Sequence, residues 1–117
     1  MGDISPSVKI YEVGPRDGLQ NLHRLTPVKD RIILIQYLKK AGLKHIEVGS
    51  FVHPKWVPNM ADSDLVFDTV KNLECELSVL VPNRRGVERA KAVGATKFNI
   101  FFSPIEVFNE LNYGKGY

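Results

Sequence analysis

The strongest constraint on the fold of this chain is a repeated alternation between short segments rich in β-branched residues and longer segments with an apolar helical stripe. Alternating and β-branched patterns predict strands at residues 8–13, 45–48, 76–81 and 97–102. Apolar residues spaced three and four apart predict helices at residues 27–41, 63–73 and 84–93. Strand–helix units that follow one another at about 30 residues form parallel sheets with right-handed crossovers.

The ends of these segments carry signals of their own. Thr26 followed by Pro27 is typical of a helix start, with threonine as the N-cap and proline at the first helical position. Gly42 and Gly94 follow the first and third helices, where a glycine commonly ends a helix. A further helix is predicted to start at 105–111. The sequence thus predicts an α/β fold with four parallel strands and three complete helices.

Two architectures fit this pattern, an open doubly wound sheet and part of an eight-stranded barrel. A TIM barrel needs roughly 250 residues, so 117 residues supply about half of one. Periodicity alone does not separate the two. We expect residues 1–117 to form a single domain unit, with a flexible N-terminus at 1–7 and a frayed end at 112–117.

Composition narrows the class of protein. The chain is 44% hydrophobic and 25% charged, which is typical of a soluble globular protein. Its net charge of +3 is too small to indicate nucleic-acid binding, although it suits an anionic ligand. No apolar run is long enough to cross a membrane, and the first residues do not resemble a targeting signal. With Cys75 as its single cysteine, the chain is expected to be cytoplasmic.

Polar residues gather where the predicted strands end. In both candidate architectures ligands bind at the carboxyl ends of the strands. The residues at or just past the four strand ends are Arg16, Asp17, Gln20 and Asn21, then Glu47 with Ser50, then Asn83, and then Ser103 with Glu106. The sequence therefore predicts one polar rim built from four consecutive strand ends.

The first of these loops has two interpretations. Arg16 and Asp17 could form an ordinary surface turn in which the two side chains pair with each other or with solvent. The loop is also long and contains glycines that let a backbone approach a ligand. In that case Asp17 is a natural ligand for Mg²⁺ or Mn²⁺, and Arg16 could offset negative charge on a carbonyl oxygen.

Glu47 lies between Ile46 and Val48 in an apolar strand, where an acid is costly unless it is paired. An ion pair with Arg16 or with a lysine is the simplest explanation. The two interpretations are compatible, because a buried glutamate that orients Arg16 would support catalysis without touching the substrate.

Three segments resemble a known family. VKIYEVGPRDGLQN, TPVKDRIILIQYLKKAGLKHIEVGSFVHPKWVPNMAD and LVPNRRGVERAKAVGATKFNIFF are similar to the N-terminal region of the hydroxymethylglutaryl-CoA lyases, which are metal-dependent TIM-barrel enzymes. The resemblance covers residues 8–112. Related acyl-transferring synthases usually have Gly-Glu-Gln where this chain has Gly-Leu-Gln, which disfavours that class.

The resemblance implies a fold, a reaction and site residues. The fold would be the first half of a TIM barrel. The reaction would be the metal-dependent cleavage of 3-hydroxy-3-methylglutaryl-CoA, an acyl-CoA substrate, into acetyl-CoA and acetoacetate. Arg16 and Glu47 would be the catalytic residues: Arg16 would stabilise the enolate, and Glu47 would hold Arg16 in place. Gln20 and Ser50, together with Arg16, would bind substrate, and Asp17 would be a ligand of Mg²⁺ or Mn²⁺.

Other family features are missing from the sequence. The His-x-His metal ligands, the later asparagine ligand and the reactive cysteine of the family have no counterpart, and Cys75 is expected to be a structural or surface thiol. Two alternatives therefore stay open. The chain could be an inactive truncated fragment, or a half-barrel binding module that needs a homo-oligomer or a second polypeptide to complete its site.

Overall fold

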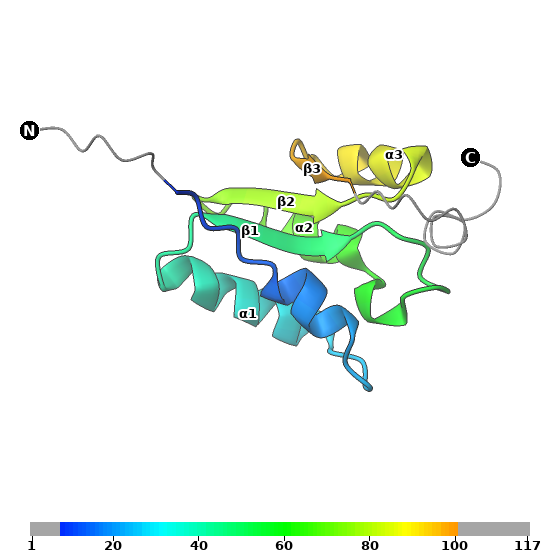
Figure 1. Cartoon of the computed structure of the whole chain (residues 1–117), viewed down its shortest axis with the longest axis horizontal. Coiled ribbons are helices and arrows are strands. Elements are labelled where there is room, and N and C mark those ends of the chain that lie inside the picture. The colour runs from blue at the N-terminus through cyan, green and yellow to red at the C-terminus, as the bar shows by residue number, and fades with distance from the viewer. Residues whose placement is uncertain (1–7, 101–117) are drawn as a thin grey trace, which may run out of the picture.

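The computed structural model describes residues 8–100, which form a three-stranded parallel sheet with helices packed against it (Figure 1). The strand order is β1 (His45–Ser50), β2 (Glu76–Leu80) and β3 (Phe98–Asn99). The helices are α1 (Val28–Lys40), α2 (Ser63–Val70) and α3 (Arg84–Ala92), with a π-helical turn η1 (Gly14–Gly18) and a 3₁₀ turn η2 (Pro58–Met60). The predicted α/β class with parallel strands and the three helices are confirmed.

The prediction of a first strand at residues 8–13 is wrong. This segment runs alongside β1, but only Glu12 pairs with it, in an isolated parallel bridge to Ile46. The Glu12 N–H donates to the carbonyl of His45 at 2.9 Å, and the Glu12 carbonyl accepts from the Glu47 N–H at 2.8 Å. Val8 and Ile10 are 85% and 68% exposed, so little packing holds the rest of the segment in a strand.

The fourth predicted strand, residues 97–102, is shorter among the described residues, where β3 covers only Phe98–Asn99. Residues 8–100 thus hold three strands in place of the four predicted. Ser103, Glu106 and the helix start predicted at 105–111 lie outside the described residues.

The predicted helices agree with the structure within a few residues. Pro27 is the residue that precedes α1, and no side-chain hydrogen bond caps the helix, so the prediction of Thr26 as N-cap is wrong. Gly42 and Gly94 have φ angles of +103° and +97°, as expected for glycines just beyond a helix end. The second and third helices end slightly earlier than predicted, at Val70 and Ala92.

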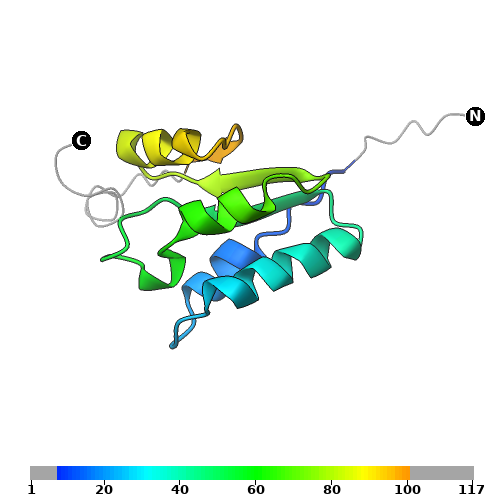
Figure 2. The same ribbon diagram turned by 180° about the vertical axis from the view of Figure 1, so that it is seen from behind.

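The apolar core lies between the sheet and its helices. Ile46 and Val48 of β1 and Val79 of β2 are fully buried there, together with Ile35 of α1 and Val66 of α2. Helix α1 packs against α2 and β1, and α2 lies behind the strands in Figure 1 and in front of them in Figure 2. Side chains alternate along a strand, so the opposite face of the sheet carries a different set of residues, which is largely polar.

Within residues 8–100, no helix combines the length and the hydropathy needed to span a membrane.

Candidate functional site

The polar face of the sheet carries an ion pair that joins the first loop to β1. The η1 turn places Arg16 there: Pro15 is buried, and the backbone N–H groups of Arg16 and Asp17 both donate to the carbonyl of Val13, at 3.1 and 2.7 Å. The Arg16 Nε then donates to Glu47 Oε1. This contact confirms the ion pair expected from an acid inside an apolar strand.

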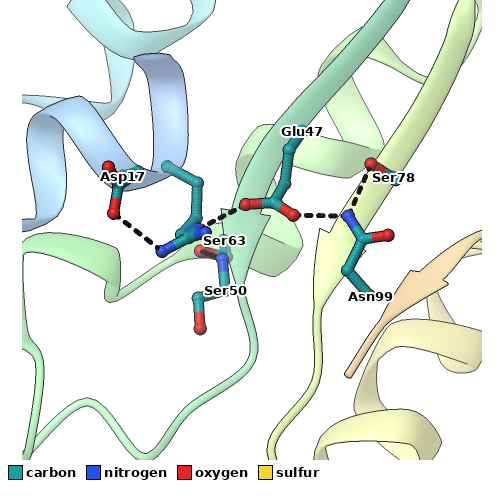
Figure 3. Close-up of polar contacts among 7 residues, drawn as sticks. Asp17, Glu47, Ser50, Ser63, Ser78 and Asn99 are labelled. Carbon is teal, nitrogen blue, oxygen red and sulfur yellow. Dashed lines mark hydrogen bonds and ion pairs between the residues drawn. The ribbon is translucent and has the colours of Figure 1, made fainter. Parts of the chain in front are cut away.

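Glu47 is 3% exposed, and both of its carboxylate oxygens accept hydrogen bonds from side chains. Oε1 accepts from Arg16, and Oε2 accepts from the Nδ2 of Asn99 on β3 (Figure 3). A buried carboxylate satisfied on both oxygens is suited to holding its partners in place.

Asn99 was not among the residues singled out from the sequence. Its Nδ2 also donates to Ser78 Oγ at 3.1 Å, so one carboxamide links β1, β2 and β3. The strand register pairs Glu47 with Ser78 and Leu80 with Asn99, which puts these residues on one face. The available signal was the same as for Glu47, a polar residue between two apolar ones, Phe98 and Ile100.

Asp17 lies at the solvent side of the ion pair. Its side chain is 58% exposed, and its Oδ1 accepts from Arg16 Nη1 at 3.2 Å (Figure 3). Carboxylate oxygen is the donor that Mg²⁺ and Mn²⁺ prefer. However, residues 8–100 contain no group of three or more His, Cys, Asp or Glu side chains that could hold a metal ion. The described residues therefore fit a metal only in part, with one oxygen ligand from Asp17.

Ser50, the last residue of β1, and Gln20, in the first loop, take no part in the ion pair. The Ser50 Oγ and the Gln20 Oε1 are both buried, and neither has a hydrogen-bond partner among the described residues. A buried polar atom without a partner is uncommon, and a bound ligand is one explanation for it. These two atoms thus differ from the Glu47 oxygens, which the protein itself satisfies.

Backbone contacts position Ser50 at the carboxyl end of β1. The Ser50 N–H donates to the Oγ of Ser63 at 3.1 Å, and that Oγ donates to the carbonyl of Met60 at 2.7 Å. The close approach requires Gly49, because a Cβ at that position would lie 2.7 Å from Ser63 Oγ and 3.0 Å from Ser63 Cβ. The first residue of α2 therefore fixes the end of β1.

Arg31 supports this junction from α1 and was also missed in the sequence. It is 2% exposed, its Nη1 donates to the carbonyl of Ala61 at 2.6 Å, and its Nη2 donates to Ser63 Oγ at 3.2 Å. Burial lowers the pKa of the Arg31 guanidinium from its ordinary value, and the nearby Asp62 carboxylate opposes that shift. The sequence signal was its position, three residues after Val28 and four before Ile35 on the buried stripe of the helix.

Asn59 ties the first loop to the second. Its Nδ2 donates to the carbonyls of Gln20 and Leu22, at 3.2 and 2.7 Å. Asn83, in contrast, accepts from the Gly86 N–H at 2.9 Å and caps α3. The structure thus joins the first loop to the loop that follows β1, while the Asn83 side chain caps a helix start.

Cys75 lies just before β2 and is half-buried. Burial raises the pKa of its thiol, and the charge of Lys39 partly opposes that shift. A raised pKa disfavours the reactive thiolate. This agrees with the prediction that Cys75 is a structural or surface thiol.

Known proteins are similar to this chain in sequence. A hydroxymethylglutaryl-CoA lyase from rat mitochondria is 48% identical over 113 residues, which are 96% of this chain and 35% of the rat protein. The lyase from Pseudomonas mevalonii is 45% identical over 107 residues, covering 91% of this chain and 36% of its own length.

Solved structures of HMG-CoA lyases are similar to this chain in fold as well. The HMG-CoA lyase of Brucella melitensis superposes with a TM-score of 0.83 at 43% identity, over 93% of this chain and 39% of that one. The HMG-CoA lyase of Acinetobacter baumannii, in complex with coenzyme A and 3-methylmalate, superposes with a TM-score of 0.87 at 35% identity, over 97% of this chain and 37% of that one.

The chain spans about a third of the length of the curated relatives it matches. The HMGL-like family profile matches residues 7–116, nearly the whole sequence. It covers the η1 turn, the Arg16–Glu47 pair and the strand that carries Asn99. The chain therefore belongs to the HMGL-like family.

Proposed function

We propose that residues 1–117 are the N-terminal half of a TIM-barrel lyase domain that cleaves 3-hydroxy-3-methylglutaryl-CoA into acetyl-CoA and acetoacetate. The observation that carries the proposal is the Arg16 guanidinium, held by the buried Glu47 beside an exposed carboxylate, Asp17. The parallel strands with their helices and the family membership support the barrel and the reaction class.

Arg16 is the proposed catalytic residue. In the cleavage, the bond between the hydroxyl-bearing carbon and the CH₂ next to the thioester breaks. Its electron pair passes to the thioester carbonyl as an enolate, and the hydroxyl loses its proton to a base as the ketone of acetoacetate forms. The enolate carbon then takes up one proton to give acetyl-CoA, so the cleavage neither gains nor loses a proton overall. A fixed guanidinium near the carbonyl oxygen would stabilise that negative charge more in the transition state than in the ground state. Glu47 keeps Arg16 in place and so acts as a positioning residue.

Gln20 and Ser50 are proposed to bind the acyl-CoA substrate. The support is the pair of buried oxygens, Gln20 Oε1 and Ser50 Oγ, which have no partner within residues 8–100. Substrate hydroxyl or amide donors would satisfy them, and the Ser50 hydroxyl could in turn donate to a substrate oxygen. The Acinetobacter relative, whose structure is in complex with coenzyme A, supports an acyl-CoA as the substrate class.

Asp17 is proposed as one ligand of a divalent metal, Mg²⁺ or Mn²⁺. Bound there, the metal would polarise oxygens of the substrate. Six oxygen ligands surround such an ion in an ordinary site, and the described residues supply one carboxylate. The remaining ligands are proposed to come from outside these residues or from the substrate.

The proposal is tested by a lyase assay on the 117-residue chain with Mg²⁺ or Mn²⁺, alone and joined to the later half-barrel of a relative. We expect turnover only in the completed form, and Asp17→Asn should raise the metal concentration needed for half-maximal turnover. The exposed Asp30→Asn is the matched control and should change nothing. A completed, folded barrel that leaves the substrate intact would overturn the proposed reaction, and rapid turnover by the short chain would overturn the proposed incompleteness.

A second candidate is a half-barrel module that completes its sheet with a copy of itself or with another polypeptide. The exposed apolar side chains of Val8 and Ile10, at the edge beside β1, favour it. Sedimentation of the chain at increasing concentration separates the candidates: concentration-dependent dimers that Ile10→Lys abolishes support the module, and a monomer at all concentrations opposes self-pairing.

The cytoplasmic location expected from the sequence stays a prediction. The rat relative is named as mitochondrial, whereas the Pseudomonas relative carries no such designation. Imaging of the tagged protein in its own cells would decide between a cytoplasmic and an organellar location.

A further inference from the structure

We propose that Asn99 is a positioning residue of this site, which locks the Glu47 carboxylate so that Arg16 presents its guanidinium in one orientation. The task assigned to Arg16 rests on the proposed function. The locking itself is a property of the chain and is tested without substrate.

The geometry makes Asn99 the second anchor of Glu47. The Asn99 carboxamide has two N–H donors, and its Nδ2 donates to Glu47 Oε2 and to Ser78 Oγ, the latter at 3.1 Å (Figure 3). Both hydrogen bonds are donated by this nitrogen. An ionised carboxylate has no proton to donate, so the Nδ2 of Asn99 must be the atom that faces Glu47. The amide therefore has one consistent orientation.

A single hydrogen bond would leave the Glu47 carboxylate free to rotate about its last side-chain torsion, which is a soft one. With Arg16 on Oε1 and Asn99 on Oε2, the plane of the carboxylate is fixed from both sides. Arg16 is sensitive to this plane because its other partner, Asp17, is 58% exposed and weakly restrained. Among the described residues, Glu47 is the buried anchor of the guanidinium, and Asn99 holds that anchor.

The placement of Asn99 also spans the sheet. Glu47 is on β1, Ser78 on β2 and Asn99 on β3, and the register places all three on the polar face. A purely structural role would be to join β2 to β3, which the Ser78 contact already does. A positioning role requires that loss of the Glu47 contact affects Arg16 beyond any effect of losing the Ser78 contact.

The test follows the Arg16 Nε–H by NMR in the whole chain and measures its exchange with water. Asn99→Ala removes the contacts to both Glu47 and Ser78. Ser78→Ala removes the Ser78 contact alone, so it is the matched control, and the difference between the two variants reports the Glu47 contact. Loss of one hydrogen bond to a charged group predicts that exchange becomes about tenfold faster in Asn99→Ala. Exchange in Ser78→Ala should stay within about twofold of the unaltered chain. Thermal unfolding of each variant shows that it is folded at the temperature of the measurement.

A second variant, Asn99→Asp, tests the same contact by changing the pH. Asn99→Asp places a carboxylate opposite Glu47, which repels it at pH 7 and should speed exchange of the Arg16 Nε–H more than Asn99→Ala does. At about pH 5 the two facing carboxyls can share a proton and restore the donor. Exchange relative to the unaltered chain at the same pH should then recover in Asn99→Asp and stay fast in Asn99→Ala.

Unchanged Arg16 exchange in Asn99→Ala, or equal changes in Asn99→Ala and Ser78→Ala, would remove the positioning role even if the lyase reaction is confirmed. Faster exchange in Asn99→Ala alone, with recovery of Asn99→Asp at the lower pH, establishes the role even if no lyase turnover is found. The failure of one proposal is therefore distinguishable from the failure of the other.

Discussion

The buried charged side chains in the described part of this protein are held in place by hydrogen bonds to other residues. Among the described residues, the buried charged side chains are Arg31 and Glu47, and each makes two hydrogen bonds to other residues. The sequence pointed to Glu47 because an acid stands between two apolar residues of a strand. It did not point to Arg31, because an arginine in an amphipathic helix is usually solvated, and only the exact phase of the helix reveals that this one faces inward.

At this scale the first prediction concerns Arg16. In a completed, active barrel, Arg16→Gln should lower kcat roughly 100-fold or more with a smaller change in KM, because the contact strengthens as negative charge develops. Steady-state kinetics measure the split, and Arg24→Gln, at an exposed position, is the control. An unchanged kcat in Arg16→Gln would contradict the proposed role.

Gly49 provides a prediction about stability. A Cβ at this position would lie 2.7 Å from Ser63 Oγ, so Gly49→Ala should destabilise the chain by about 1–3 kcal/mol. At Gly18 a Cβ would meet nothing within 4 Å, and Gly18→Ala should be close to neutral. Urea unfolding of both variants measures the difference, and equal midpoints would mean that α2 can move away from β1 at little cost.

At the scale of elements, the helices were more predictable than the strands. An amphipathic helix carries its own hydrogen bonds, so its periodicity and end signals determine it locally. A strand depends on its neighbours: residues 8–13 have the composition of a strand, yet only Glu12 pairs. The sequence does not show which edge has a neighbour, and this explains why the first strand was predicted wrongly. It also explains why the contacts of Asn99 across β1, β2 and β3 were not foreseen.

Arg31 links two elements, α1 and the start of α2. Helix α2 has no side-chain cap, and the residue before it, Asp62, has a left-handed φ of 62°. We expect Arg31→Leu to cost about 1–3 kcal/mol, because the Ala61 carbonyl and Ser63 lose a charged donor. Hydrogen exchange should show the largest loss of protection in the first turn of α2. Lys29→Leu, on the exposed side of α1, should change stability by less than about 0.5 kcal/mol, and similar losses in both variants would contradict the link.

At the scale of the whole molecule, each end of the sheet carries its own cluster of charged side chains. The Arg16–Glu47 pair lies toward the carboxyl ends of the strands, and a second cluster lies at their amino ends. The amino ends of β1 and β2 are joined by His45 Nδ1 and Glu76 Oε2 at 2.5 Å, and Lys97 Nζ lies 3.5 Å from Glu76 Oε1. The hydrogen bond from His45 lowers the pKa of the Glu76 carboxyl below its ordinary value of 4.5, with a further contribution from Lys97. The polar site lies farther along the strands, so this cluster concerns stability.

The direction of the Glu76 shift predicts an acid dependence. A carboxyl whose pKa is lower in the folded state stabilises the fold above its unfolded value and loses that contribution as pH falls through the folded value. The unaltered chain should therefore exceed Glu76→Gln in thermal stability at pH 7, and the gap should close as pH falls below 4.5. The exposed Glu88→Gln is the control. A gap that widens in acid would contradict the sign of this coupling.

The irregular pairing of β1 with β2 has a consequence for the packing of the core. The register steps from Glu47 opposite Ser78 to Gly49 opposite Val79, so Val48 is an extra residue in the ladder. Deleting Val48 would make the ladder regular, with Gly49 still opposite Val79 and Ser50 still opposite Leu80, so Ser50 would keep its face of the sheet. The deletion would instead remove a fully buried valine from the core between β1 and its helices. The extra residue therefore adds apolar packing to the core and leaves unchanged which residues reach the carboxyl end of the strand.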